Sequence, residues 1–354
     1  MRAVVYEEFR LTPEIVSVAD PACPPEGVVV AVEATGLCRS DWHGWMGHDP
    51  AIRLPHVPGH ELAGTVVEVG PDVRAWSTGA RVTTPFVLAC GSCATCRRGD
   101  HQVCDRQFQP GFTHPGSFAE LVAIDRADVN LVALPDALDF DTAAGLGCRF
   151  GTAYRAVVDV GEVGAGDRVV VHGCGGVGLS AVMIAVARGA EVIAVDVARA
   201  SLDLALSMGA TTALDASSVA VADAVHEITG GGADVSIDAL GSRVTMESSL
   251  RCLRKRGRHL QVGLLAGADA SPAVPMELVV GSELQLLGSH GMAASEYPRM
   301  LAEIADGSLQ PGRLIRDRID LDDAPARLAA LGSPDAGAGG ITIIRPQSVR
   351  PGRS

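Results

Sequence analysis

The stretch that decides the fold is Arg168-Val169-Val170-Val171-His172-Gly173-Cys174-Gly175-Gly176-Val177-Gly178. Its first half is a short apolar run that predicts a buried parallel strand, and its second half matches the pattern G-x-G-x-x-G. The alanine-rich, apolar residues 179–188 that follow predict a helix. A glycine-rich turn between a strand and a helix lets backbone N–H groups approach a pyrophosphate at the positive end of the helix dipole. We therefore predict that a dinucleotide binds at Gly173, Gly175, Gly176, Val177 and Gly178. A glycine-rich turn without a ligand is the alternative.

A second predicted strand, residues 191–195, ends at Asp196, eighteen residues beyond Gly178. A carboxylate at this position accepts hydrogen bonds from the adenosine ribose diol and repels a 2′-phosphate, which favours NAD over NADP. Arg199 lies three residues farther along and is the kind of cation that holds a 2′-phosphate. NAD is therefore the predicted cofactor, with NADP as the alternative.

Strands and helices continue to alternate beyond Asp196. The predicted strands are residues 235–240, 259–263 and 284–288, and the predicted helices are residues 202–208, 220–228 and 244–253. This alternation is typical of an α/β fold with a doubly wound parallel sheet, which six strands would complete. We predict a dinucleotide-binding domain over residues 150–288.

The sequence on either side of this region has a different character. Short β-like runs at residues 28–32, 64–69 and 121–124 lie among many prolines and glycines, which predicts an irregular, mostly-β domain. The C-terminal segment contains a predicted helix at 296–305 and a predicted strand at 341–344, too little for a core of its own. We therefore predict that residues 1–149 and 289–354 form one domain.

Four of the nine cysteines form a compact run, C-x2-C-x2-C-x7-C, at Cys90, Cys93, Cys96 and Cys104. Zinc takes four thiolates in a tetrahedron at about 2.3 Å, and gaps of two residues let turns bring successive sulfurs onto one ion. Because all four coordination positions are filled, this predicted zinc is structural. Disulfides in a secreted protein and an iron–sulfur cluster are the alternatives.

A second predicted metal site combines three residues that lie far apart in the chain. Cys38, His60 and Cys148 each lie in a glycine-rich turn. Two thiolates and one imidazole leave one zinc position open for a reactant, which is the arrangement of a catalytic site. A single cysteine or histidine is more often a packed or hydrogen-bonded residue, so the prediction depends on the three together. Two zinc ions per chain are predicted in total.

With these motifs, nearly the whole chain resembles the zinc-containing alcohol dehydrogenases of the medium-chain dehydrogenase/reductase superfamily. Residues 59–61 match the family's G-H-E signature, in which His60 is a zinc ligand and Glu61 an occasional, transient ligand. The element C-x-[ST]-D-x-H supplies the first ligand, and Cys148 matches the third. The resemblance implies a GroES-like catalytic domain that carries the four-cysteine lobe as its structural zinc site.

The resemblance also implies roles for the residues around Cys38. Asp41 would hold a ligand imidazole and fix its tautomer. Ser40 would accept a hydrogen bond from the substrate hydroxyl and pass its proton through the nicotinamide ribose to His43, which has a pKa of about 6.5 if it is exposed. Zinc would stabilise the alkoxide while the hydride passes to the nicotinamide C4.

Further assignments follow from the resemblance by position. Arg39 would contact the cofactor pyrophosphate, although an arginine in a turn is often only solvated. The ends of the last two strands of the sheet would lie against the nicotinamide, at Val262, Gly263, Leu264 and Ser289. Trp42, Trp45 and Phe86 would line the substrate pocket, with lid packing as an alternative for Trp45.

Two positions depart from better-known members of the family. Arg149 follows Cys148 where glycine is more common, and Gly340 stands where some members carry an arginine for the pyrophosphate. We hypothesise that Arg149 replaces that arginine or meets an anionic substrate. Cys23, Cys174 and Cys252 have no predicted metal role.

Length and composition agree with a two-domain enzyme. The chain has 354 residues, 47% of them hydrophobic, and a net charge of −13, which is unfavourable for nucleic-acid binding. The N-terminus reads as a strand and no apolar run is long enough to span a membrane, so we expect a cytoplasmic protein. A homo-oligomer is expected from the resemblance, with a tetramer favoured over a dimer.

The predicted function is reversible hydride transfer between an alcohol and NAD, which gives an aldehyde or ketone. A dehydrogenase of the same family that acts on a polyol, an amino alcohol or a glutathione adduct would carry the same motifs. A zinc-lobe interaction module and a non-catalytic NAD sensor are the non-enzymatic alternatives. The small-molecule alcohol itself is not encoded in any motif.

Overall fold

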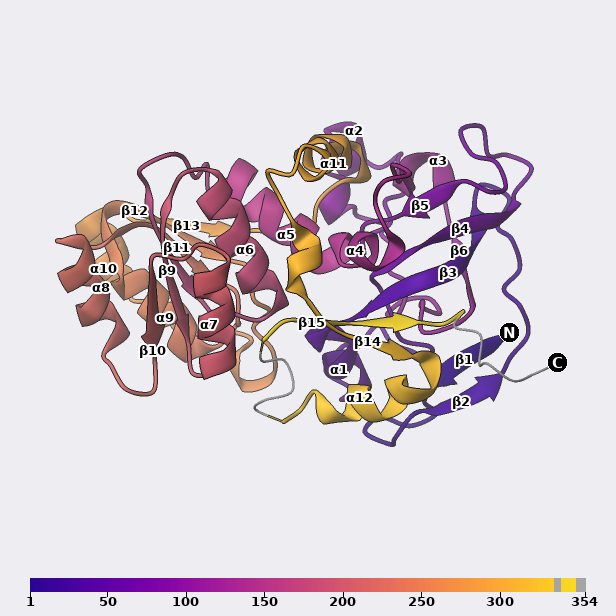
Figure 1. Ribbon diagram of the computed structural model, residues 1–354, viewed down its shortest axis with the longest axis horizontal. Helices are drawn as coiled ribbons and strands as arrows, with labels where there is room; N and C mark the ends of the chain where they lie inside the picture. The colour runs from indigo at the N-terminus through magenta and orange to yellow at the C-terminus, as the bar shows by residue number, and fades with distance from the viewer. Residues whose placement is uncertain (334–338, 348–354) are drawn as a thin grey trace.

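The computed structural model describes residues 1–333 and 339–347, which form two β-sheets side by side (Figure 1). The sheet on the left of the view comes from the middle of the chain, and the sheet on the right from its two ends. Short helices between residues 140 and 187 run between the two sheets. The fold class predicted from the sequence is confirmed.

The middle of the chain forms a six-stranded parallel sheet in the order β10-β9-β8-β11-β12-β13. Numbered by appearance, this is the order 3-2-1-4-5-6 of doubly wound dinucleotide-binding domains, with the switch point between β8 and β11. Parallel pairing buries both faces, which is why β8 is the apolar run Val169–Val171. The strands are β8 (Arg168–His172), β9 (Glu191–Asp196), β10 (Thr212–Asp215), β11 (Ala233–Asp238), β12 (Leu253–Gln261) and β13 (Gln285–Gly288).

Two features of this sheet differ from the ranges predicted from the sequence. Strand β10 was not predicted, because its four residues are all only partly buried and form no apolar run. Strand β12 begins at Leu253, which was predicted to end the preceding helix. The reason for the difference is that the charged residues Arg254, Lys255 and Arg256 are not typical of a strand. The helices around the sheet are α6 (Gly176–Ala187), α7 (Arg199–Ser207), α8 (Val221–Thr229), α9 (Arg243–Arg251) and α10 (Met276–Ser282).

The two ends of the chain build a seven-stranded sheet in the order β14-β15-β3-β4-β5-β7, with β6 also paired to β3. Strand β15 pairs antiparallel with β3, so the C-terminal segment returns to the N-terminal one, as predicted (Figure 1). The strands are β3 (Val28–Leu37), β4 (Leu62–Val69), β5 (Arg81–Thr83), β6 (Leu121–Ile124), β7 (Val132–Ala133), β14 (Ile315–Asp320) and β15 (Ile341–Arg345), with β1 (Arg2–Val5) and β2 (Glu14–Ser17) as a separate pair. The helices are α1 (Arg39–Trp45), α2 (Ala94–Arg97), α3 (Ala127–Asn130), α4 (Phe140–Ala144), α5 (Gly151–Arg155), α11 (Tyr297–Ala305) and α12 (Ala324–Ala330).

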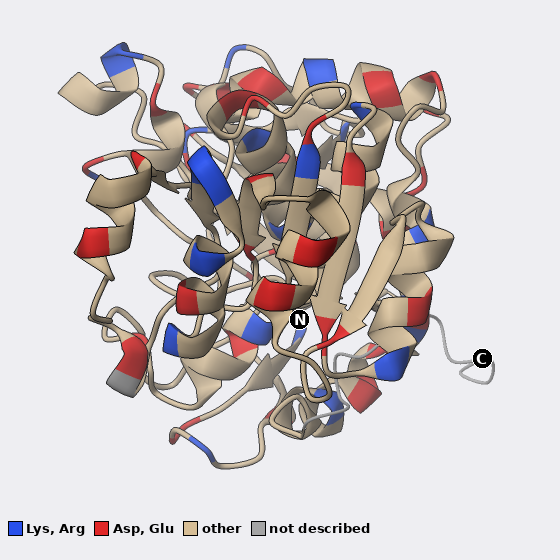
Figure 2. Cartoon of the chain, turned by 90° about the vertical axis from the view of Figure 1, so that its left-hand side faces the viewer, with Lys and Arg blue, Asp and Glu red and all other residues tan. Residues whose placement is uncertain are grey.

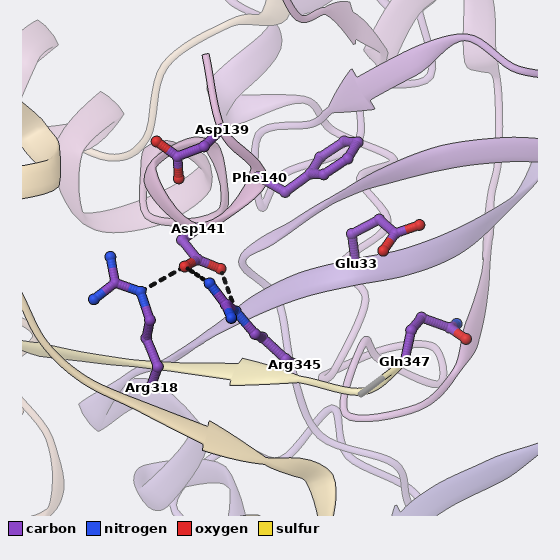
Figure 3. Close-up of a pocket in the computed structure, with 7 residues that line it drawn as sticks. All are labelled: Glu33, Asp139, Phe140, Asp141, Arg318, Arg345 and Gln347. Carbon is purple, nitrogen blue, oxygen red and sulfur yellow. Dashed lines mark hydrogen bonds and ion pairs between the residues drawn. The ribbon is translucent and has the colours of Figure 1, made fainter. Parts of the chain in front are cut away.

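Asp141, on α4, ties the returning C-terminal strands to this domain (Figure 3). Its carboxylate accepts from Arg318 Nε of β14 at 2.6 Å and from Arg345 Nε of β15 at 2.9 Å. The three residues lie in a surface cavity of about 570 Å³ whose other lining residues are Glu33, Asp139, Phe140 and Gln347. None of the predicted metal ligands lines this cavity, so the predicted chemistry lies elsewhere.

The surface of the six-stranded sheet domain carries both signs of charge. Figure 2 shows acidic and basic residues interspersed along the elements on this side of the described chain. Within residues 1–333 and 339–347, no helix is long and apolar enough to cross a membrane.

Candidate metal centres and cofactor site

The four-cysteine lobe lies in the loop between β5 and β6 and folds around a common centre. The sulfurs of Cys90, Cys93, Cys96 and Cys104 all lie within 4.8 Å of one another. The sulfurs of Cys90 and Cys96 are 3.9 Å apart and those of Cys93 and Cys104 3.8 Å apart. A tetrahedron with zinc–sulfur bonds of about 2.3 Å has edges of about 3.8 Å, whereas a disulfide requires about 2.05 Å. The spacing therefore fits a single metal ion and excludes disulfides within the lobe.

Backbone N–H groups stabilise the charged form of two of these sulfurs, whereas burial raises the pKa of the other two thiols, Cys96 and Cys104. Cys90 Sγ accepts from Ser92 N at 3.5 Å and from Cys93 N at 3.3 Å, and these bonds lower the pKa of Cys90 to about 5. Cys93 Sγ accepts from Cys96 N at 3.3 Å, which lowers its pKa as well. A loop that already stabilises thiolates is prepared for a cation.

The second cluster assembles from three separate elements. Cys38 lies between β3 and α1, His60 lies directly before β4, and Cys148 lies in a π-helical turn (Leu146–Phe150) between α4 and α5. One ligand atom from each residue lies within 4.8 Å of the other two. The structure thus brings together the three residues that the sequence singled out. π-Helical turns are often found at functional sites, where an extra residue re-aims a side chain.

Asp41 fixes the geometry of this cluster from the first turn of α1. Its carboxylate accepts from His60 Nδ1 at 2.8 Å, from Cys38 N at 2.9 Å and from Gly59 N at 3.1 Å. One buried side chain therefore holds two of the ligand-bearing segments in place. With Nδ1 donating to Asp41, the lone pair of His60 Nε2 is free for a metal.

The donor atoms of the cluster fit a zinc ion. His60 Nε2 is buried and has no hydrogen-bond partner in the chain, a state that is costly unless a ligand uses the atom. Hydrogen bonding from Cys148 lowers the pKa of the Cys38 thiol well below its usual range. Burial would lower the pKa of His60, but the Asp41 carboxylate raises it well above its usual range, so a metal would have to displace a proton there.

Glu61 and Arg149 form a buried ion pair beside the cluster. Glu61 Oε1 accepts from Arg149 N at 2.8 Å and Arg149 Nε at 3.0 Å, and Oε2 accepts from the guanidinium Nη2. The remaining guanidinium nitrogen donates to Leu37 O at 3.0 Å. Burial would lower the pKa of Arg149, but Glu61 raises it above its usual range, whereas burial raises the pKa of Glu61 although Arg149 lowers it. The direct contact between the two groups favours their ionised forms.

This pairing contradicts the hypothesis that Arg149 meets an anionic substrate or the pyrophosphate. Its side chain is only 6% exposed and its guanidinium is occupied by Glu61 and Leu37. Glu61 has both oxygens engaged in the same pair, which holds it in one orientation. No local pattern indicates this contact, since the two residues are 88 positions apart.

Aromatic rings surround His60. Phe86 lies with its ring 6.2 Å from the His60 ring, and Phe112 lies at 5.2 Å. His290 packs edge-on against Phe86 at 5.1 Å. Phe112 and His290 were not predicted, because neither lies in a motif. Trp45, in contrast, is a core residue that donates its Nε1–H to Leu11 O at 2.6 Å, so it is not available to line a pocket.

The glycine-rich turn joins β8 to α6 as predicted. Gly173 has φ +87°, which favours glycine, and a Cβ on Gly178 would lie 1.7 Å from Gly173 O, so a side chain there is excluded. A Cβ on Gly175 would meet no atom within 4 Å, which leaves that side of the turn open to a ligand. Gly176 and Val177 form the first turn of α6. Asp196 ends β9, and one oxygen accepts from Cys174 N at 2.6 Å.

The metal cluster and the glycine-rich turn lie against each other. A Cβ on Gly176 would lie 2.4 Å from Arg149 Cδ, so the residue after Cys148 packs directly on the turn. The turn after the carboxyl end of β8, where a doubly wound sheet holds a dinucleotide, therefore lies beside the cysteine–histidine cluster.

The remaining predicted cofactor residues lie in different surroundings. Arg39 places its guanidinium 4.4 Å over the Trp42 ring and donates to Leu331 O. Arg199 is exposed and pairs with Asp203 at 2.9 Å along α7. Val262 and Gly263 follow β12 and are partly buried, Leu264 is exposed, and Ser289 is buried after β13.

The predicted proton-transfer residues follow one another along α1. Ser40 lies on its first turn and His43 on its next, both half-buried. Burial, assisted by Arg39 and His48, lowers the pKa of His43 to about 4, so the value of about 6.5 expected for an exposed imidazole does not apply. The partner that the sequence did not predict is His48, whose Nδ1 lies 2.9 Å from His43 Nδ1.

Comparison with known proteins defines the class. Residues 24–136 match the family model of the alcohol dehydrogenase GroES-like domain, and residues 176–306 match that of zinc-binding dehydrogenases. The chain belongs to the zinc-containing alcohol dehydrogenases of the medium-chain dehydrogenase/reductase superfamily, oxidoreductases that act on CH–OH groups.

Similar proteins differ in their named substrates. An alcohol dehydrogenase from Geobacillus stearothermophilus is 35% identical over 312 residues, which cover 88% of this chain and 90% of the relative. An L-threonine 3-dehydrogenase from Streptomyces coelicolor is 31% identical over 97% of this chain and 99% of the relative. The solved alcohol dehydrogenase TADH from Thermus sp. ATN1 has a TM-score of 0.89 and 30% identity, and the alignment covers 98% of this chain and 99% of that one. Family membership therefore leaves the substrate open.

Proposed function

We propose that this chain catalyses the reversible oxidation of an alcohol to an aldehyde or ketone with NAD, with a catalytic zinc at Cys38, His60 and Cys148. The observation that carries the proposal is the packing of Arg149, next to Cys148, on Gly176 of the glycine-rich turn. This contact puts a three-donor metal cluster beside the place where a dinucleotide crosses the sheet.

The chain's own residues have separate tasks in this reaction. Zinc at these ligands supplies Lewis acidity, which makes an alcohol hydroxyl more acidic, and NAD supplies the hydride acceptor. Asp41 holds the His60 ring in the required tautomer. Ser40 accepts the hydroxyl proton while it gives up its own, and His43, three residues along the same helix, is the next base. Phe86 and Phe112 keep water away from the reacting carbon.

Four further assignments complete the cofactor side. The glycine-rich turn holds the pyrophosphate, and Asp196 holds the adenosine ribose. NAD is proposed over NADP because Arg199 is already paired with Asp203 on α7. Arg39 steadies the pyrophosphate, and Val262, Gly263, Leu264 and Ser289 lie along the nicotinamide.

Residues 150–288 are proposed as the cofactor domain and residues 1–149 and 289–354 as the catalytic domain, a division that the two sheets support.

The second zinc, at Cys90, Cys93, Cys96 and Cys104, is proposed to be structural. The four sulfurs fill a tetrahedron, so no position is left for a reactant. Glu61 is proposed to remain with Arg149 and not to act as a steady zinc ligand, because both of its oxygens are already engaged.

The experiment that tests the function combines turnover with metal content. We expect NADH formation from at least one member of a panel of primary, secondary, aromatic, polyol and amino alcohols, slower turnover with NADP, and two zinc ions per chain. An amino alcohol is the second candidate substrate, favoured by the L-threonine 3-dehydrogenase among the similar proteins. Cofactor binding without turnover on the whole panel would support an NAD sensor instead.

Two cysteine variants separate the two metal sites. Cys38→Ala should lose one zinc and nearly all turnover while thermal unfolding changes little, since only a reactant-binding ion is removed. Cys93→Ala should lose the other zinc and unfold at lower temperature, with activity falling in parallel. Equal effects of both variants on turnover and on unfolding would contradict the assignment of one catalytic and one structural ion.

A homo-oligomer is also proposed. Strand β13 is an outer strand of the six-stranded sheet, and Gln285, Leu286 and Gly288 on it are exposed. Helix α10, which precedes it, buries none of its residues and exposes Met276 and Val280. An open apolar strand edge favours pairing with another strand, and a second copy of this chain offers the same edge across a two-fold axis.

A further inference from the structure

The end of helix α1 folds His48 back over His43. Helix α1 ends at Trp45, and Gly47 adopts φ +80°, the left-handed conformation that terminates helices and favours glycine. Two backbone bonds close this turn, from Gly47 N to Gly44 O at 2.9 Å and from His48 N to His43 O at 3.0 Å. The turn therefore fixes the position of His48 relative to a residue five positions earlier.

The two imidazoles form a direct hydrogen bond. Their Nδ1 atoms are 2.9 Å apart, and the ring centroids are 5.2 Å apart. Such a contact requires one Nδ1–H donor and one Nδ1 lone pair, so the two rings hold different tautomers. The pair can gain one proton without breaking the contact, whereas two gained protons would place two N–H groups against each other. It is therefore built to accept and pass on protons one at a time.

The surroundings direct a proton from His43 toward His48. His43 is half-buried, while His48 is exposed, so water solvates a charge on His48 far better. The Trp42 ring lies 5.0 Å from His43 and 5.8 Å from His48, and the Arg39 guanidinium lies 4.4 Å over that ring.

The groups around His43 shift its pKa in both directions, and those that lower it prevail. Burial and the positive charge of Arg39 lower the pKa of His43, whereas the nearby Cys38 thiolate raises it. Asp49, next to His48 in the chain, accepts from Ala51 N at 2.8 Å. A proton on His43 is thus held weakly, and His48 is the base in contact with it.

We propose that His48 receives the substrate proton from His43 and releases it to solvent. The inference rests on the proposed function, because that function supplies the proton. In alcohol oxidation, the hydroxyl proton arrives at the His43 ring, the His43 Nδ1–H bond breaks as the His48 Nδ1–H bond forms, and His48 gives one proton to water or to a buffer base. No electrons move in this step, and the reverse sequence delivers a proton for aldehyde or ketone reduction.

The first test needs no turnover. In ¹⁵N NMR titrations of the full chain, we expect the ring nitrogens of His43 to respond to protonation of both rings, as coupled sites do. In His48→Gln, we expect a single step for His43, with its proton affinity changed about threefold or more. The control is His226→Gln, on α8, whose Nε2–H donates to Arg251 O at 2.9 Å and which lies outside the proposed site. An unchanged His43 titration in His48→Gln overturns the pairing.

The second test is the dependence of turnover on pH and buffer. In dilute buffer at pH 6, we expect kcat for alcohol oxidation by His48→Gln to fall about fivefold to tenfold, less than the loss of a group that acts on the substrate directly. Imidazole at high concentration should restore it to within about twofold, because a small base can replace an exposed relay residue. His226→Gln should show neither effect.

Each outcome decides the proposal. A coupled pair with buffer rescue supports it, and a coupled pair with unchanged kcat, pH profile and buffer dependence overturns the role of His48 in proton release. If the wild-type protein turns over no alcohol, the proposed function fails, while the titration still decides whether the pair exists. His48→Asn serves as a second variant if the glutamine variant unfolds at lower temperature.

Discussion

At the scale of single residues, Asp41 has the most influence on the candidate zinc site. Its carboxylate contacts the ring of His60 and the backbone N–H groups of Cys38 and Gly59. A ligand cluster drawn from distant segments needs such a group, because each loop alone would place its donor atom imprecisely. The same contact fixes which nitrogen of His60 faces the sulfurs.

Replacing this carboxylate should weaken metal binding before it affects the fold. In Asp41→Asn, the amide group cannot accept from both ligand segments, so we expect zinc affinity at the Cys38 site to fall about 10- to 100-fold. The measurement is zinc release to a chelating dye. Asp128→Asn is the matched control, since Asp128 also accepts two backbone N–H groups, from Arg74 and Ala75, at 2.9 Å each. Equal zinc release from both variants would show that Asp41 has no special role.

The Glu61–Arg149 pair makes the second prediction at this scale. Glu61 is fully buried, so Arg149→Met leaves a carboxylate without its partner, and we expect a loss of about 3–5 kcal/mol in the free energy of unfolding. Chemical denaturation of zinc-loaded protein measures this loss. Removing both charges in Glu61→Leu/Arg149→Met should recover much of it.

Arg251→Met is the control for this measurement. Its partner, Glu247, lies four residues away on the exposed face of α9, so less than about 1 kcal/mol should be lost. A loss for Arg149→Met as small as that for the control, or a double variant less stable than the single one, would mean that the pair is not ionised and buried as described.

At the scale of elements, α1 concentrates the proposed chemistry in seven residues. Cys38 precedes the helix, Ser40 and Asp41 lie on its first turn, and His43 lies on its second. The glycine turn after the helix then adds His48 to the same place. A short, capped helix gives these groups fixed relative positions that a loop would not.

The contact of α4 with β14 and β15 predicts a pH-dependent stability. Burial would raise the pKa of Asp141, but hydrogen bonds from Arg345 and Arg318 lower it below its ordinary value. A carboxylate whose pKa is lower in the folded than in the unfolded state stabilises the fold fully at pH values above its unfolded-state pKa. This contribution is lost as the pH falls through the folded-state pKa. Asp141→Asn should therefore unfold at lower temperature than wild type near pH 7, and the difference should shrink below about pH 4.

Thermal unfolding followed by circular dichroism across this pH range checks the prediction. Asp136→Asn is the control, because Asp136 is fully exposed and 3.8 Å from Arg81, so it should match wild type at every pH. A difference between Asp141→Asn and wild type that persists unchanged at low pH would argue against an electrostatic cause.

At the scale of the whole molecule, local spacing made much of the structure predictable. The glycine-rich turn and the four-cysteine run are each set by residues a few positions apart, so the dinucleotide fold and the metal lobe could be inferred directly. Strand β10 could not, because Thr212–Asp215 lies on an edge and shows no burial pattern. Contacts such as Glu61–Arg149 depend on how the chain folds between two residues 88 positions apart, and no local pattern encodes them.

The pairing of His43 with His48 lies between these cases. Helix α1 itself was not predicted, but a glycine such as Gly47 after a helix is a recognisable termination signal, and a tight turn brings the following residue back to the helix. The turn could therefore be predicted from the sequence. The orientation of the two rings, which brings their Nδ1 atoms to 2.9 Å from each other, could not.

The open edge of the six-stranded sheet predicts the assembly state. Pairing of β13 with its copy across a two-fold axis would continue one sheet through two chains and cover Leu286, Met276 and Val280. A charge at the centre of that edge would be buried without a partner, so Leu286→Arg should separate the two copies. We expect the wild type to be a tetramer of four chains of 36.5 kDa, with a dimer as the alternative. In sedimentation equilibrium, Leu286→Arg should then have half the mass of the wild type.

A matched substitution distinguishes pairing at this edge from a general effect of added charge. Leu206 on α7 is 41% exposed, against 40% for Leu286, so Leu206→Arg adds the same charge at equal exposure away from the strand edge. We expect Leu206→Arg to keep the wild-type mass. Because the candidate zinc site of each chain is complete within that chain, the separated Leu286→Arg form should retain its zinc content even where its stability is lower. A monomeric wild type, or an unchanged mass for Leu286→Arg, would place any contact between copies on another surface.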